Sequence, residues 1–274
     1  PLALTAPSMS VYAIPPKIDD ITEFVSTISP ILDINPDQLA HQLATTTSPF
    51  IWLKRQVDPS LRPILSQWDH TQVGTIKTQR RVYPNHGLAS HITGFVGIDN
   101  QGLGGLEYYY DQQLKGSEGQ IILEGDPRGR QLLSGQRSTI PNKDGSHIVT
   151  TIDERIQFSA ETHLKQGVLD AQAIQGHVVV MDPKTGDVLA MANYPSFDAN
   201  LWSESDAQIR KNRAVLDVYE PGSIFKVITL SAVLEEDVVT PNRVMPVPET
   251  LSLYGHDISE AHERDDDDPD EYSI

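Results

Sequence analysis

Residues 219–234 read Tyr-Glu-Pro-Gly-Ser-Ile-Phe-Lys-Val-Ile-Thr-Leu-Ser-Ala-Val-Leu, a sharp break followed by a long apolar run. The Pro221-Gly222 pair ends whatever structure precedes it, which places Ser223 at the start of a new helix. The residues after Lys226 are almost all apolar. This pattern predicts a helix that is buried nearly all round, as the central helix of an α/β domain is.

Ser223 and Lys226 are three residues apart, a spacing that places both side chains on one face of a helix. A serine hydroxyl is a poor nucleophile until a neighbouring base takes its proton. A lysine amine can serve as that base only where apolar surroundings lower its pKa. The helix N-terminus adds free N–H groups and partial positive charge, which favour an oxyanion. The pair is therefore a candidate nucleophile and general base for acyl transfer.

The bare Ser-x-x-Lys motif is weak on its own. With 21 serines and 9 lysines in 274 residues, roughly 0.7 such matches are expected by chance. Taken alone, the motif leaves an ordinary N-cap role open for Ser223.

Two apolar runs, 177–181 and 187–192, flank the turn 182–186, which contains Pro and Gly. This arrangement predicts a β-hairpin. Upstream of it, residues 147–152 are predicted to form a strand. Asp153 is predicted to cap a helix that reaches about residue 173. The apolar positions expected on the inner face of that helix are Ile156, Ala160, Leu164 and Val168.

The first 80 residues alternate between strand and helix signals. Residues 10–14 read as a short strand, residues 50–53 as a buried strand and residues 74–78 as an exposed one. One helix is predicted from the helical spacing of apolar residues over 18–28. A second is predicted to begin at Asn35-Pro36-Asp37, where a capping residue precedes a proline at the first helical position.

The segment 85–145 is rich in glycine, with its most marked turn at residues 100–105. Residues 142–145, Asn-Lys-Asp-Gly, are the predicted boundary between two domains. Glu107 follows the turn, and we expect its carboxylate to pair with Arg80 or Arg81 rather than to act as a catalytic acid. None of the nine histidines has a metal-ligand spacing such as His-x-x-x-His.

The composition, 38% apolar and 22% charged, suits a globular protein with cores. A net charge of −17 argues against nucleic acid as a partner, because phosphate binding needs a basic face. Residues 258–274 are strongly acidic, with eight Asp or Glu against Arg264 alone. The run Asp265–Asp268 lacks the alternating spacing of a calcium loop and is expected to be a solvated segment. There is no cysteine, which excludes disulfides and thiolate chemistry.

Several segments together resemble class B penicillin-binding proteins. Residues 220–226, Glu-Pro-Gly-Ser-Ile-Phe-Lys, resemble the first active-site box of that family. The predicted hairpin resembles the strand pair that opens the family's transpeptidase domain. The turn 99–107 resembles the cell-division branch more than the elongation branch. Further similar segments are 193–198, Asn212-Arg213, 80–84, 94–99, 104–107 and 114–116.

This resemblance implies an α+β protein in two parts. Residues 1–145 would form an elongated N-terminal pedestal, of the family's dimerisation type. Residues 146–274 would form the first part of a penicillin-binding/β-lactamase-like transpeptidase domain, with an antiparallel sheet, helices and a central serine helix. Ser223 would be the nucleophile and Lys226 the general base of a peptidoglycan D,D-transpeptidase that β-lactams acylate.

The resemblance also implies partners and a location. Peptidoglycan stem peptides and β-lactam antibiotics would bind at the serine, and membrane proteins of the division complex would bind through the pedestal. No metal or organic cofactor and no nucleic acid is expected. The protein would face the periplasm at the septum, tethered to the inner membrane by a helix outside this sequence.

The chain departs from the family pattern after Ser223. No Ser-x-Asn occurs anywhere, no Lys-Thr-Gly follows the serine, and only 51 residues remain. We expect a fragment. Lys184-Thr185-Gly186 spells the family's third box, but it precedes the serine in a hairpin turn, so Lys184 is expected to be a solvated turn residue. Alternatives remain open: a division scaffold with a vestigial serine fold, an elongation-type transpeptidase or a β-lactam sensor.

Overall fold

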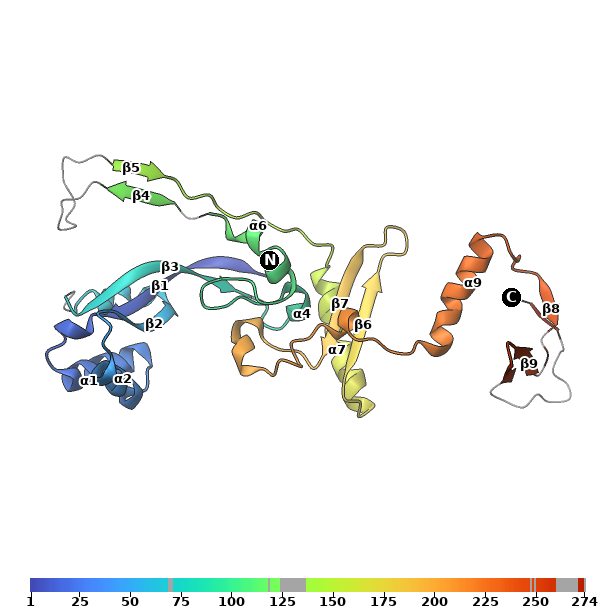
Figure 1. Cartoon of the computed structure of the whole chain (residues 1–274), viewed down its shortest axis with the longest axis horizontal. Helices are drawn as coiled ribbons and strands as arrows, with labels where there is room; N and C mark the ends of the chain where they lie inside the picture. Colours follow the sequence, from blue (N-terminus) through green and yellow to red (C-terminus); the bar gives the residue numbers. More distant parts are fainter. Residues whose placement is uncertain are drawn as a thin grey trace. The chain divides into compact units, whose positions relative to one another are not determined.

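The structure is a computed structural model that describes residues 1–68, 71–117, 119–123, 137–246, 248, 250–259 and 271–273 (Figure 1). The chain divides into two compact units, Pro1–Asp217 and Val218–Ile274. Among the described residues, no helix combines the length and the apolar character that crossing a membrane requires.

The first unit begins with a three-stranded antiparallel sheet in the order β2-β1-β3 (Figure 1). The central strand β1 (Leu4–Ala13) pairs with β2 (Ile51–Val57) and β3 (Val73–Val82). The strands predicted at 10–14, 50–53 and 74–78 are therefore confirmed. Short helical turns follow the strands along the chain: η1 (Pro15–Lys17) after β1, and η2 (Pro59–Leu61) with α3 (Arg62–Leu65) between β2 and β3.

Helices α1 (Ile21–Leu32) and α2 (Pro36–Thr45) pack with this sheet around the first core, and both predicted helices are confirmed. The Asp20 carboxylate accepts hydrogen bonds from the first-turn N–H groups of α1. The Asn35 side chain does the same for α2. Each cap satisfies donors that a helix end otherwise leaves unpaired. The core buries Val11, Ala13, Ile28, Leu32 and Leu39 almost completely.

One detail of the strand prediction is wrong. Ile51 is buried, but Phe50 and Trp52 are exposed. Successive side chains of a strand point to opposite faces, so Trp52 lies with its cross-strand neighbour Tyr12 on the face away from the core. Phe50 packs at 4.9 Å from the Tyr12 ring and at 4.8 Å from the Trp52 ring. The apolar residues of the run 50–53 thus serve two places: Ile51 packs in the first core, and Phe50 and Trp52 pack in this aromatic cluster.

A second core forms where the glycine-rich segment meets residues 197–209. Tyr83, Phe95, Phe197 and Ala199 are buried there. The predicted turn at 100–105 is confirmed: the Leu103 N–H donates to the Phe95 carbonyl at 2.9 Å. This segment also forms three short helices and a strand pair: α4 (Ser90–Thr93), α5 (Gly105–Tyr109), α6 (Asp111–Lys115), β4 (Gln120–Leu123) and β5 (Arg137–Ile140).

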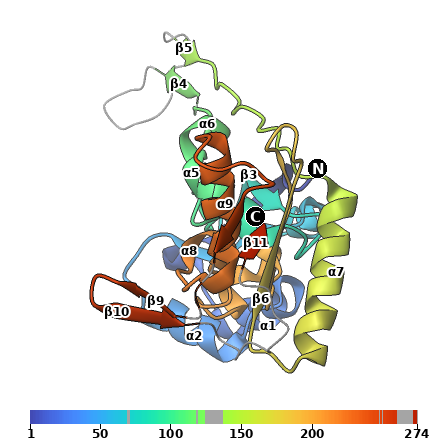
Figure 2. The same cartoon turned by 90° about the vertical axis from the view of Figure 1, so that its right-hand side faces the viewer.

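The last part of the first unit contains the predicted hairpin, which is confirmed as β6 (Gly176–Met181) and β7 (Val188–Tyr194). Helix α7 (Glu154–Asp170) runs along it (Figure 2), capped by Asp153 as predicted. Two short helices follow: η3 (Ala199–Glu204) and α8 (Arg213–Leu216).

The strand predicted at residues 147–152 is wrong, because that segment is irregular. A strand needs a neighbour along its length. Among the described contacts, this stretch and the following Asp153 make only isolated bonds to β7: the Thr151 hydroxyl donates to the Val188 carbonyl at 2.6 Å, and the Asp153 N–H donates to the Leu189 carbonyl at 2.9 Å.

The second unit contains η4 (Gly222–Ile224), α9 (Phe225–Glu235) and two strand pairs, formed by β8 (Val244–Pro246) with β11 (Glu271–Ser273) and β9 (Thr250–Leu253) with β10 (His256–Ser259). The prediction that the serine helix is buried nearly all round is wrong for this unit, since α9 has no buried residue. Among the described residues of the unit, η4 is its principal contact. The run Asp265–Asp268 lies outside the described residues.

Candidate active site

Ser223 occupies the middle of the 3-10 turn η4, directly before α9. Gly222 has a φ of +55°. A Cβ there would meet nothing within 4 Å, so conformation rather than space favours glycine at this position. The Ile224 N–H donates to the Pro221 carbonyl at 3.3 Å, which closes the turn. The sequence predicted a helix that begins at Ser223; in the structure Ser223 lies in a 3-10 turn, and α9 begins two residues later, at Phe225.

Lys226 is in the first turn of α9. Its side chain and that of Ser223 are both exposed. Within the described residues, no hydrogen bond joins the two side chains. The described part of this unit gives the two side chains no apolar cover, and the roles of Ser223 and Lys226 remain predictions.

Lys184 is placed as the sequence predicted. It is an exposed residue of the β6–β7 turn, and its N–H donates to the Asp182 carboxylate at 2.8 Å. The Thr185 hydroxyl donates to Asp187 at 2.9 Å, and Gly186 has a φ of +79°. These bonds serve the hairpin turn itself. The solvated-turn prediction for Lys184 is confirmed, and its dispensability for chemistry remains a prediction.

The Asn212-Arg213 pair, noted for its resemblance, joins α8 to the end of β7. The Asn193 side chain is buried; its amide N–H donates to the side-chain Oδ1 of Asn212 at 3.0 Å, and its own Oδ1 accepts from the Ala214 N–H at 3.0 Å. The Asn212 amide donates to the His91 carbonyl at 3.4 Å. This chain of bonds fixes α8 against the hairpin and the glycine-rich segment.

Asp217, the last residue of the first unit, receives two cations. The Lys211 amine lies 2.5 Å from one carboxylate oxygen and the Arg213 guanidinium 3.1 Å from the other. Hydrogen bonds from Lys211 and then Arg213 lower the pKa of Asp217 below its ordinary value. The carboxylate therefore stays ionised, and its two ion pairs hold Asp217 against the start of α8 and the residues before it, six residues before Ser223.

The expected pairing of Glu107 is confirmed with Arg81. The Arg81 Nε donates to the Glu107 carboxylate at 2.7 Å, and the glutamate is only 5% exposed. Arg80 instead lies 3.8 Å from Asp58. This pair joins the glycine-rich segment to β3, because Glu107 lies in that segment and Arg81 in the strand. Removing either partner would leave an uncompensated charge in a buried place.

Sequence reasoning missed two polar residues of α7. Gln157 is fully buried, and its amide bonds to both the N–H (2.8 Å) and the carbonyl (3.0 Å) of Met191. The Glu161 carboxylate accepts from the Ala89 N–H at 2.8 Å and from Gln157 at 2.7 Å. Burial raises the pKa of Glu161, and these two hydrogen bonds oppose that effect. Their burial could have been predicted from helical spacing, because Gln157 and Glu161 lie on the same face of α7 as Leu164 and Val168.

His91 is a further buried polar residue of the first unit. It lies in α4, is buried, and its Nε2 donates to the Ile209 carbonyl at 2.8 Å. Its ring packs edge-on at 5.1 Å from the Phe197 ring. Burial lowers the pKa of His91, and the neighbouring Arg213 charge acts in the same direction.

Comparison with protein families identifies both parts of the chain. The family model described as the penicillin-binding protein dimerisation domain matches residues 1–150, and that of the penicillin-binding protein transpeptidase domain matches residues 176–272. The chain belongs to the class B penicillin-binding proteins. The second match includes Ser223 and Lys226.

Curated relatives in this family include probable peptidoglycan D,D-transpeptidase PenA of Neisseria meningitidis serogroup A. It is 34% identical over 85% of this chain and 41% of the relative. Peptidoglycan D,D-transpeptidase FtsI of Escherichia coli K12 is 31% identical over 95% of this chain and 45% of its own length. The chain thus spans about two fifths of the length of these relatives.

Solved penicillin-binding protein structures show the same fold. A complex between PBP2 and MreC from Helicobacter pylori matches with a TM-score of 0.71, at 20% identity, over 99% of this chain and 55% of that one. Penicillin binding protein 2X from Streptococcus thermophilus matches with a TM-score of 0.64, at 23% identity, over 95% and 42%. The predicted α+β fold, a pedestal followed by the first part of a transpeptidase domain, is confirmed.

Proposed function

We propose that this chain is part of a serine D,D-transpeptidase that cross-links peptidoglycan during cell division. The observation that carries the proposal is Ser223, three residues before Lys226 at the entry to α9, within the residues that match the transpeptidase family model. Relatives named peptidoglycan D,D-transpeptidases support the same reaction.

In the proposed reaction, the Ser223 hydroxyl attacks the carbonyl of the penultimate D-alanine of a stem peptide. Lys226 takes the hydroxyl proton and returns it to the leaving terminal D-alanine. The acyl group on Ser223 then passes to the amine of a neighbouring stem peptide, which regenerates the serine. A β-lactam would acylate Ser223 in the same way, as a mimic of the substrate.

We place the domain boundary at residues 142–145, with a pedestal at 1–145 and the first part of the transpeptidase domain at 146–274. The Ser-x-Asn and Lys-Thr-Gly boxes would come from a longer protein, in keeping with relatives more than twice as long. That protein would act on the periplasmic side of the inner membrane, at the septum. The pedestal would bind division-complex proteins, as the PBP2–MreC complex of a structural neighbour suggests by analogy.

Labelling with fluorescent penicillin tests this proposal in a longer protein that contains this chain and both further boxes. Ser223→Ala should abolish labelling. Ser231→Ala is the matched control, because its hydroxyl donates to the Val227 carbonyl at 2.7 Å, two turns further along α9. Labelling that survives Ser223→Ala would contradict the proposed nucleophile, and a wild-type protein that is never labelled would favour a scaffold.

A further inference from the structure

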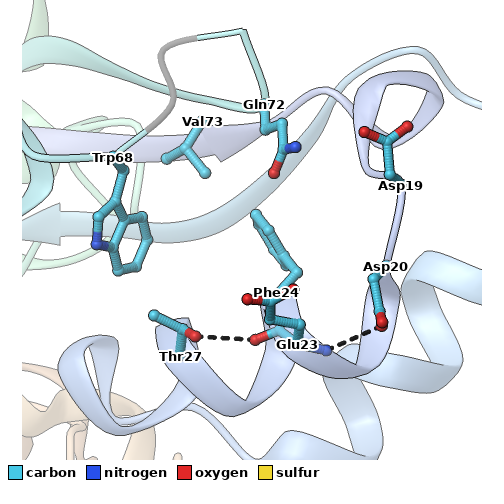
Figure 3. A pocket seen from close by; sticks show the side chains of 8 residues that line it. All are labelled: Asp19, Asp20, Glu23, Phe24, Thr27, Trp68, Gln72 and Val73. Atoms are coloured by element: carbon cyan, nitrogen blue, oxygen red, sulfur yellow. Dashed lines mark hydrogen bonds between the residues drawn. The ribbon is translucent and has the colours of Figure 1, made fainter.

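A pocket of about 320 Å³ opens at the start of α1, remote in sequence from the candidate serine (Figure 3). The Phe24 ring and the Trp68 indole supply aromatic surface, and Val73 and Gln72 at the start of β3 complete that wall. The volume is at the lower end of the range for ligand pockets, roughly 300–1,000 Å³. It suits one long side chain better than a large organic ligand.

Carboxylates form the rim of this pocket. Asp19, Asp20 and Glu23 all line it, and none of its eight lining residues is basic. Asp20 is already used, since one carboxylate oxygen caps α1. Among the described contacts, no ion pair or side-chain hydrogen bond engages the carboxylate of Asp19 or of Glu23. Two exposed carboxylates therefore remain available beside an aromatic wall.

A pocket with free carboxylates beside an aromatic wall favours the binding of a cation that has an apolar stem. Opposite charge within reach of Asp19 and Glu23 is favourable, and an anion would be repelled both locally and by the net charge of −17. A guanidinium stacks on aromatic faces and donates in a planar fork that matches carboxylates. The methylene stem of such a side chain can lie along apolar surface such as that of Phe24 and Val73.

We propose that this pocket, which we name the α1 pocket, binds an arginine side chain presented by a partner protein. The guanidinium lies between the Trp68 indole and the carboxylates of Asp19 and Glu23. The inference gives the pedestal a recognition site of defined chemistry. It does not rest on the acyl-transfer reaction, so its test succeeds or fails independently of Ser223.

The test uses the 274-residue chain and two blocked tripeptides, acetyl-Gly-Arg-Gly-amide and the same peptide with citrulline. Citrulline keeps the shape of arginine but is uncharged. The readout is the NMR signal of the Trp68 indole N–H. The arginine peptide should move that signal saturably, and the citrulline peptide should not at the same concentration. Added salt should weaken the response, because exposed charges are screened.

Variants locate the site. Asp19→Asn and Glu23→Gln should each weaken arginine-peptide binding by about two- to fivefold, the size expected for an exposed ion pair. Asp37→Asn is the matched control, since Asp37 occupies the first turn of α2 as Glu23 does that of α1, but does not line the pocket. Asp20 is left intact because its replacement would remove a helix cap.

Three outcomes would overturn the proposal. The first is an unmoved Trp68 signal with the arginine peptide. The second is an equal response to arginine and citrulline, which would mean that shape alone is recognised. The third is a loss with Asp37→Asn as large as that with Glu23→Gln, which would show a general charge effect. The peptide comparison uses the unsubstituted chain, so it stands even if a variant fails to fold.

Discussion

The core of the first unit and helix α9 of the second unit are made of similar residues in opposite surroundings. Val11 and Ile28 are completely buried between the β2-β1-β3 sheet and helices α1 and α2. In α9, by contrast, Val227 is 67% exposed and Ile228 is 59% exposed. An apolar sequence alone therefore does not determine burial. Whether an apolar helix is buried depends on elements elsewhere in the chain that pack against it.

The consequence for α9 is energetic. Each Å² of apolar surface that stays in water lacks about 25 cal/mol of the stabilising free energy that burial would provide. An isolated helix of this length is marginal in water, because nucleation is costly and tertiary packing usually supplies the stability. The first core has both packing and caps. The two regions should therefore differ in every measurement that reports local stability.

The largest expected effect concerns hydrogen exchange of this chain. Amides of β1 and α1 should exchange more slowly than those of α9 by on the order of 10³-fold or more. Buried elements open with free energies that approach the global value of about 5–15 kcal/mol, whereas uncovered ones open locally. Mass spectrometry of the exchanging chain measures both regions at once. Equal protection of α9 and β1 would mean that α9 is covered in solution.

The next effect compares two lysines, one from each unit. In a longer protein that contains all three family boxes, Lys226→Ala should slow acylation by penicillin by roughly 10²–10⁴-fold, since the proposed general base is lost. Lys184→Ala should leave the rate nearly unchanged, because Lys184 is an exposed turn residue of the β6–β7 hairpin. A large defect from Lys184→Ala would instead assign the early Lys-Thr-Gly a catalytic role.

A smaller effect compares two isoleucines. Ile28→Ala should destabilise the chain by about 2–5 kcal/mol, because it leaves a cavity in a packed core. Ile228→Ala on exposed α9 should cost less than about 0.5 kcal/mol. Urea unfolding followed by tryptophan fluorescence and by far-UV circular dichroism measures both. A cost for Ile228→Ala as large as that for Ile28→Ala would show that α9 is packed.

Several elements that the sequence predicted have local causes. Asn35 and Asp153 cap helices through bonds to residues two or three positions on, so their signals lie within one turn. The β6–β7 hairpin is likewise set by a turn between two apolar runs.

The failures have non-local causes. Residues 147–152 have strand composition but form no strand pairing in the described chain, and α9 has apolar composition without cover from the described residues. Gln157 was missed because its partner, the backbone of Met191, lies 34 residues away. Of the candidate site, the sequence predicted the Ser223 turn and the exposure of Lys184. It did not predict the contacts of Asn193 or Asp217, which depend on how α8 meets the hairpin.

The smallest expected effect is a pH dependence of the first unit that arises at His91. The folded pKa of His91 lies below its ordinary 6.5 because burial disfavours the charged ring. The hydrogen bond to the Ile209 carbonyl opposes this effect, and the Arg213 charge adds to it. In the window below pH 6.5 the unfolded chain takes up a proton that the folded chain resists, so stability is present above that pH and is lost as the pH falls.

The melting temperature should therefore drop between pH 7.5 and pH 5.5, and His91→Gln should reduce the drop. Glu161 contributes with the opposite sign, because its raised pKa favours the folded state as the pH falls, so the difference between variant and parent isolates His91. His41→Gln, at an exposed position of α2, is the matched control and should leave the drop unchanged. A drop of equal size in parent and His91→Gln would show that the burial of His91 does not govern this dependence, and that the pH response of the first unit arises elsewhere.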